Sequence, residues 1–260
     1  MADRIFSGYT PDFRFSQIIY KSQTPRRGPP RYHANGVASL ASFPIVSKDF
    51  PVEQRSWHVL AACERAAALA LLIVASPAIL LSALVVWRLS GRAPFIAHRR
   101  VGWRGASLWM LKLRTMWGPD APAARGCGRC WVEFIADDSG PALKQSSDAR
   151  VPNAFARFCR RHSIDELPQL WHVVRGEMLL IGPRPITRAE LREYYGSKAE
   201  EILQCKPGIA GLWQTCGRGR LTYRERLLLD LEFVRHRSPG MYVRILLRTV
   251  GEVWSGANAW

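Results

Sequence analysis

The sequence is poor in acidic residues, and this absence limits the partners it can have. Its 21 Asp and Glu residues face 37 Lys and Arg residues, so the formal net charge is +16 at pH 7. Arginine supplies 31 of these cations, and its planar guanidinium group binds phosphate and carboxylate groups through paired hydrogen bonds. We therefore predict an anionic partner: nucleic acid, an anionic membrane surface or a phosphorylated small molecule.

Other signatures are missing as well. The six cysteines are widely dispersed in a chain of 260 residues, which excludes the disulfide framework of a small secreted domain and favours a reduced, cytosolic setting. Cys127 and Cys130 form a Cys-x-x-Cys pair that has no second pair to complete a zinc site. The histidines lack metal-ligand spacing and are expected as polar surface or capping residues; these are His98, His162, His172 and His236. No helix-turn-helix, zinc-finger or RNP-type motif occurs, so nucleic acid is not the expected partner.

Only one long apolar run is present. Ala66 to Trp87 are 22 residues without a charge, long enough as a helix to cover the roughly 30 Å hydrocarbon core of a membrane. The run lies too far from the N-terminus, and lacks the cleavage signature, to be a signal peptide. We predict a membrane helix over residues 56–90.

Ser76 and Pro77 lie at the centre of this run. A proline inside a helix loses one backbone hydrogen bond and bends the axis, and the Ser76 hydroxyl can bind a carbonyl group that Pro77 leaves free. Arginines flank the run on both sides, so a single span would place one basic flank outside the cell. The positive-inside rule favours a re-entrant helix with both ends on the cytoplasmic face, and a kinked spanning helix is the alternative.

The rest of the chain divides into a tail and a cytosolic domain. Residues 1–55 are basic and contain Pro and Gly without periodicity, as expected of a flexible tail. Residues 91–260 show a mixed pattern: a short hairpin around residues 102–105, a loop over 117–141, and helices near 149–161, 185–199 and 222–236. Residues 242–254 carry an apolar stripe that fits an interfacial helix or a core-facing one. The predicted fold class is α+β, mostly helical.

Asp165 and Glu166 are the candidate catalytic residues. Pro168 is best placed at the first position of a helix, which puts both carboxylates in an extended entrance where the helix dipole favours anions. A capping box between Ser163 and Glu166 is the other reading of this stretch. A carboxylate here can attack phosphorus if Mg²⁺ and nearby cations offset the repulsion; the nominated cations are Lys112, Arg114, Arg160 and Arg184. The same residues also fit a surface ion-pair cluster.

Taken together, the motifs resemble one family from about residue 57 to the end of the chain: the bacterial sugar transferases, or monotopic phosphoglycosyl transferases. The matching segments occur in order along the chain and are Ser76-Pro77, Arg100-Val101-Gly102, Lys112-Leu113-Arg114-Thr115-Met116, Ser163-Ile164-Asp165-Glu166-Leu167-Pro168-Gln169-Leu170-Trp171, Gly182-Pro183-Arg184-Pro185 and Lys206-Pro207-Gly208-Ile209-Ala210-Gly211-Leu212-Trp213-Gln214. Ala210 stands where Thr is commoner in the family, and the loop between Cys127 and Cys130 has no counterpart.

The resemblance implies an enzyme at the cytoplasmic face of the inner membrane. It implies transfer of a hexose 1-phosphate, with galactose or glucose expected, from a UDP-sugar to undecaprenyl (polyprenyl) phosphate, with release of UMP at the start of exopolysaccharide synthesis. Asp165 would be the nucleophile, and Mg²⁺ would bind beside Glu166 and Asp165. Lys112, Arg160 and Arg184 would contact phosphate, and Ser76-Pro77 would break a re-entrant, monotopic helix. Anionic lipids are expected partners, and a homo-oligomer is left open.

Two other functions remain open from the residues alone. A basic, non-enzymatic membrane-associated protein would use the net charge itself, and its nucleic-acid affinity would fall steeply with salt. A metal-dependent phosphatase using the same Asp-Glu pair would release sugar phosphate without any lipid acceptor.

Overall fold

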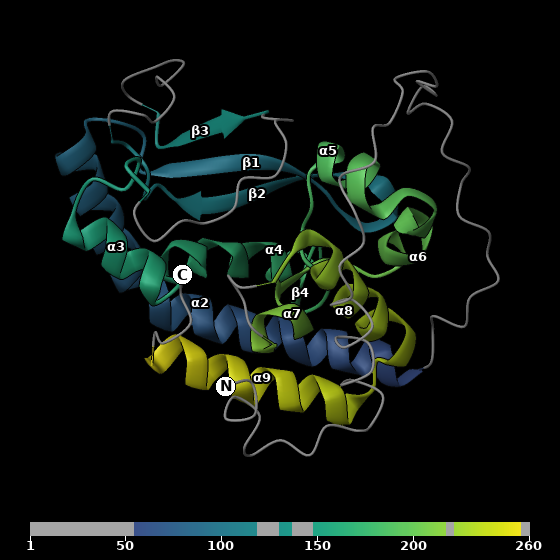
Figure 1. Cartoon of the computed structure of the whole chain (residues 1–260). Helices are drawn as coiled ribbons and strands as arrows, with labels where there is room; N and C mark the ends of the chain where they lie inside the picture. Colours follow the sequence, from purple (N-terminus) through teal and green to yellow (C-terminus); the bar gives the residue numbers. More distant parts are fainter. Residues whose placement is uncertain (1–54, 119–129, 137–147, 217–220, 256–260) are drawn as a thin grey trace, which may run out of the picture. The chain divides into compact units, whose positions relative to one another are not determined.

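The structure is a computed structural model that describes residues 55–118, 130–136, 148–216 and 221–255. The described chain is mostly helical with short strands, which confirms that part of the predicted fold class (Figure 1). The predicted flexible tail lies outside the described residues except for Arg55, and so does Cys127.

Helix α2, Arg55–Ser90, contains the whole apolar run. Its segment Val59–Ser90 is long and apolar enough to cross a membrane, and it is alone in this among the described residues. One stripe of the helix is buried, and its members recur at helical spacing: Ala68, Ile79, Ala83 and Val86. The opposite side leaves large apolar residues exposed, among them Ile73, Val74, Leu80 and Leu81. An exposed apolar surface of this length is typical of a helix that contacts a membrane or a partner protein.

The hydrogen bond predicted for the Ser76 hydroxyl is present. Pro77 lies inside α2 and has no N–H to donate to the carbonyl four residues earlier, which belongs to Ile73. The Ser76 Oγ donates to that same Ile73 carbonyl at 2.8 Å. The serine therefore satisfies the acceptor that the proline leaves open.

The predicted hairpin is also confirmed. Strands β1, Phe95–Val101, and β2, Ser107–Leu113, pair antiparallel with Val101 opposite Ser107 and Phe95 opposite Leu113. A short 3-10 turn, η2 (Trp103–Gly105), connects them. Gly105 has a φ of 81°, a left-handed conformation that glycine adopts without steric cost.

The loop predicted over residues 117–141 is partly wrong, because it contains a strand. Strand β3, Val132–Ile135, pairs parallel with β1, so the sheet order is β2-β1-β3. The four residues of β3 are held by hydrogen bonds to β1, which is distant in sequence, and no local alternation of apolar and polar residues marks them as a strand. Short apolar runs of this kind cannot be assigned from periodicity.

The catalytic candidates lie in the segment that follows the sheet. It consists of α3 (Ala154–Arg161), the 3-10 helix η3 (Ile164–Gln169) and α4 (Leu170–Val174). Asn153 begins α3 by accepting a hydrogen bond from the Ala156 N–H at 2.9 Å. Because η3 contacts both β2 and α2, it is held between the sheet and the membrane helix, as the position of α4 in Figure 1 indicates.

The C-terminal half is built from short elements and two longer helices. Its elements are β4 (Leu179–Ile181), α5 (Arg188–Glu190), η4 (Leu191–Tyr195), η5 (Gly196–Lys198), α6 (Ala199–Leu203), β5 (Gly208–Ala210), α7 (Leu212–Thr215), α8 (Tyr223–His236) and α9 (Pro239–Ser255). Helix α8 matches its prediction and begins with a capping box between Thr222 and Glu225. The helical prediction over residues 185–199 is confirmed in part. The chain from residue 188 to residue 198 is helical, but as three successive turns of different type, α5, a π turn and a 3-10 turn, and Gly196 has a positive φ of 45°.

Helix α9 has features of both predicted types of helix, the core-facing one and the interfacial one. Tyr242 and Ile245 are buried in the protein, whereas Val243, Leu247 and Val250 are exposed. The helix is joined to α2 by a hydrogen bond from the Tyr242 hydroxyl to the Glu64 carboxylate. Glu64 also accepts from the Leu180 N–H of β4 at 2.8 Å, so one buried carboxylate links α2, β4 and α9.

Candidate active site

The two candidate carboxylates lie in the first turn of η3, and the sequence expectations for their backbone are wrong. Ser163 precedes the turn with a left-handed φ of 55° and makes no side-chain cap, so the capping box is absent. Pro168 lies inside η3, and α4 begins only at Leu170. Asp165 and Glu166 therefore are not an extended pair. With about three residues per turn, their side chains leave the axis roughly 120° apart.

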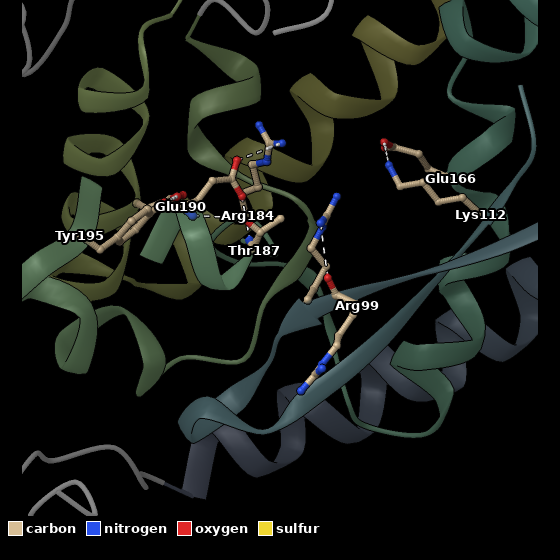
Figure 2. Close-up of polar contacts among 9 residues, drawn as sticks. Arg99, Lys112, Glu166, Arg184, Thr187, Glu190 and Tyr195 are labelled. Atoms are coloured by element: carbon tan, nitrogen blue, oxygen red, sulfur yellow. Dashed lines mark hydrogen bonds and ion pairs between the residues drawn. The ribbon is translucent and has the colours of Figure 1, made fainter. Parts of the chain in front are cut away.

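Glu166 is joined to Lys112 of β2. The Lys112 Nζ lies 2.9 Å from the Glu166 Oε1, and both side chains are largely buried (Figure 2). The contact brings one of the nominated cations to a candidate carboxylate, although 54 positions separate the two residues in sequence. A partly buried ion pair of this kind fixes the position of both groups.

Asp165 is buried against α3. Only 5% of the residue is exposed. Burial raises the pKa of the neighbouring Cys159 thiol to about 11, and the negative charge of Asp165 contributes to this rise. The cysteine is thus an uncharged apolar neighbour of the carboxylate.

Arg160 follows Cys159 in the last turn of α3. It is 7% exposed, and its Nε and Nη2 atoms are buried without a hydrogen-bond partner among the described residues. A buried guanidinium group is costly unless acceptors surround it. The Nε2 atom of Gln169, at the other end of η3, is also buried without a partner in the described part. Sequence reasoning nominated Arg160 and missed Gln169.

Arg114 makes different contacts. Its side chain donates to the Glu133 carboxylate of β3 and, through Nε, to the Ala93 carbonyl at 2.7 Å. These contacts connect the end of β2 to β3 and to the chain before β1. The Arg114 side chain thus stabilises the sheet, a role that its motif did not indicate.

Arg184 lies in a second polar cluster. Its guanidinium group is 3.8 Å from the Glu190 carboxylate and lies over the Trp213 ring at 5.6 Å (Figure 2). The cluster also contains Tyr195 and Asp230, whose hydroxyl and carboxylate groups are 3.4 Å apart.

Asp230 is the titratable centre of this second cluster. It is 1% exposed, and burial raises the pKa of its carboxyl group to about 7 despite the opposing effect of Arg184. Sequence reasoning missed Asp230. The available signal was its position among Leu227, Leu231 and Val234 on the apolar stripe of α8, where a carboxylate must be buried.

Close backbone contact explains two glycines of the motifs. A Cβ atom on Gly208 would lie 2.0 Å from the Gly182 nitrogen, and one on Gly182 would lie 2.7 Å from the Lys206 carbonyl oxygen. Gly208 begins β5, which pairs with β4, and Gly182 directly follows β4. Glycine at both positions therefore lets the two backbone segments approach closely just before Arg184.

The cysteine and histidine side chains remain to be placed. Within the described ranges no group of three or more His, Cys, Asp or Glu side chains gathers as a metal site. Cys130 is exposed. His172 is not a surface residue as expected: it is buried and hydrogen-bonded through both ring nitrogens.

Comparison with known proteins agrees with this architecture. A family model described as bacterial sugar transferase matches residues 56–256. The chain belongs to this family. The match confirms the resemblance and the predicted class of enzyme, a phosphoglycosyl transferase.

Curated relatives include proteins of similar and of greater length. The UDP-galactose-lipid carrier transferase of Erwinia amylovora is 35% identical over 72% of this chain, which spans only 38% of that relative. The exopolysaccharide production protein ExoY of Sinorhizobium fredii is 35% identical over 78% of the chain and 85% of its own length. The UDP-glucose:undecaprenyl-phosphate glucose-1-phosphate transferase of Caulobacter vibrioides is 34% identical over 71% of the chain and 66% of its own length.

The raised pKa of Asp230 predicts a specific dependence of stability on pH. The folded state holds this proton up to about pH 7, whereas an ordinary Asp loses it near 3.8. The stability contributed by the neutral carboxyl group is complete below pH 4 and is lost as the pH rises through 7. Asp230→Asn cannot ionise, so its unfolding midpoint should rise relative to that of the unmodified transferase between pH 5 and 8.

The measurement is thermal unfolding of the detergent-solubilised protein across that pH range. Glu200→Gln removes an exposed carboxylate from α6 and serves as the control, for which no such trend is expected. A difference between Asp230→Asn and the unmodified protein that stays constant with pH would contradict the assignment.

Proposed function

We propose that this bacterial sugar transferase moves a hexose 1-phosphate from a UDP-sugar to undecaprenyl (polyprenyl) phosphate and releases UMP. The names of two relatives support this: one is a UDP-glucose:undecaprenyl-phosphate glucose-1-phosphate transferase and another a UDP-galactose-lipid carrier transferase. Glucose and galactose are accordingly the proposed hexoses. The similarity to an exopolysaccharide production protein supports a role in initiating such a polymer.

The observation that carries the proposal is the buried guanidinium group of Arg160. It lies in the last turn of the helix that leads into η3, and two of its nitrogen atoms have no protein acceptor in the described chain. The phosphate oxygens of a nucleotide sugar would supply the acceptors. Lys112 adds a second cation at η3 through its contact with Glu166. We assign Arg184 to the donor as well; it lies in the Gly182-Pro183-Arg184-Pro185 motif that follows β4.

The chemistry is a double displacement at phosphorus. A carboxylate oxygen of Asp165 attacks the β-phosphorus of the donor and forms a P–O bond, while the bond from that phosphorus to the bridging oxygen breaks. UMP leaves with that oxygen and its electron pair. A phosphate oxygen of the polyprenyl phosphate then attacks the same phosphorus, and the Asp165 carboxylate departs unchanged.

The two carboxylates fit Mg²⁺ as a cofactor. Oxygen ligands suit this ion, which is commonly held by one or two carboxylates together with substrate phosphates rather than by a full protein cage. Asp165 and Glu166 would hold it. When bound, Mg²⁺ would neutralise charge on the phosphate oxygens. Lys112 holds the Glu166 carboxylate in place, and the buried position of Asp165 limits the access of water.

The proposed setting is the cytoplasmic face of the inner membrane. Exposed apolar residues on α2 and α9 support contact with the acyl chains, and both helices are joined at Glu64. We propose that α2 bends at Ser76 and Pro77 and re-enters the cytoplasmic face, which makes the protein monotopic. The surplus of arginine supports binding of anionic lipids around this helix.

The first prediction is lipid-dependent release of UMP. Purified protein reconstituted in bilayers with Mg²⁺ should form UMP from UDP-glucose or UDP-galactose when polyprenyl phosphate is present. Asp165→Asn should reduce turnover by at least about 10³-fold, because the amide is a poor nucleophile, and should bind membranes normally.

The controls separate the competing functions. Release of free sugar phosphate without a lipid acceptor would indicate a phosphatase instead. If the folded protein formed no UMP from any of a panel of UDP-sugars, the transferase function would be contradicted. Full activity of Asp165→Asn would contradict the assignment of Asp165 as the nucleophile.

The second prediction concerns Arg160. Arg160→Met keeps an unbranched apolar stem but removes the guanidinium group that would donate hydrogen bonds to phosphate, so kcat/KM for the UDP-sugar should fall by roughly 10²-fold. Arg157→Met alters an exposed arginine on the same helix and should change kcat/KM less than about twofold. Steady-state UMP assays of both variants make the comparison, and equal losses would overturn the assignment.

The third prediction tests the topology of α2. Cysteines introduced as Arg55→Cys and Arg88→Cys mark its two ends. A membrane-impermeant maleimide should label neither position above background in intact spheroplasts and both in inverted vesicles. The unmodified chain gives the background, because Cys63 and Cys130 are exposed. Labelling of one end from outside would show that α2 spans the membrane.

A further inference from the structure

His172 is a buried side chain to which no role has been given. It lies in α4, six positions after Glu166, and is 6% exposed. The Leu111 N–H of β2 donates to its Nε2 at 3.1 Å. Its Nδ1 lies 2.7 Å from the Glu177 carboxylate. A backbone amide can only donate, so Nε2 is the acceptor and Nδ1 carries the proton that is donated to Glu177.

The Leu111 contact fixes an edge of the sheet. Strand β2 is an outer strand in the order β2-β1-β3, and the amide groups of an edge strand need acceptors outside the sheet. His172 provides one for Leu111. The next residue along β2 is Lys112, whose ammonium group pairs with Glu166. Two adjacent positions of β2 are thus tied to the single segment formed by η3 and α4.

The imidazole ring is itself held from the other side. The Glu177 carboxylate that accepts from Nδ1 is also paired with Arg175 at 2.9 Å. The N–H groups of Glu177 and Met178 donate to the His172 carbonyl at 2.8 and 3.2 Å. The turn after α4 therefore closes on His172, and ring and backbone are both restrained.

We propose that His172 is a positioning residue that sets the distance between Lys112 on β2 and Glu166 on η3. It acts through the Leu111 amide and not by contact with reactants. Without this acceptor, the edge of β2 is free to shift from η3 and the Lys112 ammonium loses its fixed place beside the carboxylates. The kinetic part of this proposal rests on the proposed transferase function, whereas its structural part does not.

Two conservative substitutions separate the two hydrogen bonds. His172→Gln can place an amide oxygen near the Nε2 position and keep the Leu111 bond. His172→Asn reaches only to the Nδ1 position, so it keeps the contact with Glu177 and loses Leu111. We expect His172→Asn to lower kcat by about tenfold with little change in KM, and His172→Gln to retain most of the rate. His236→Asn changes an exposed histidine on α8 and is the matched control.

A double-mutant cycle shows whether the effect passes through Lys112. In a Lys112→Met background, His172→Asn should lower kcat by less than about twofold, because the lysine side chain that His172 positions is absent. A purely structural role would cost the same factor in both backgrounds and would overturn the proposal.

Hydrogen exchange provides a readout that does not depend on activity. The β2 peptide containing Leu111 should exchange faster in His172→Asn than in His172→Gln or the unmodified protein. Equal exchange in all three would overturn the proposal even if no donor is ever turned over. If His172→Asn shows the expected faster exchange but no variant forms UMP, the result would count against the transferase function alone.

Discussion

Helix α2 has to satisfy two surroundings at once. Its inner stripe, which includes Ala68, Ala83 and Val86, is fully buried, and its outer side is apolar and exposed. The inner stripe contributes to two of the hydrophobic clusters, one with Leu108 and Met178 and one with Leu113 and Cys159. The elements that carry the site are therefore assembled on the same helix whose other side exposes a large apolar surface.

This arrangement places polar chemistry beside an apolar surface. The segment η3 contacts both α2 and β2, so Asp165 is buried and Glu166 partly buried next to the long apolar helix. Burial strengthens the interaction between Lys112 and Glu166 and makes an unsatisfied guanidinium group such as that of Arg160 unfavourable. A site of this kind suits a reaction in which a soluble nucleotide sugar meets a lipid phosphate.

Much of the architecture was predictable because its signals are local. The capping box of α8, the glycine-bearing hairpin and the Ser76 contact with the carbonyl group opposite Pro77 each depend on residues a few positions apart. Strand β3 was missed because its partner β1 is distant in sequence. The break in the 185–199 region follows from the π turn and from Gly196, which no periodicity reveals.

The sequence by itself determined the long apolar helix, the family and the identity of the candidate residues, because these depend on composition, spacing and motif. Only the tertiary structure decided how those residues are used. It placed Arg114 in the sheet with Glu133 and joined Lys112 to Glu166, and it buried Asp230 and His172. The physical reason is that burial and hydrogen-bond partners arise from contacts between distant segments, which a local pattern does not encode.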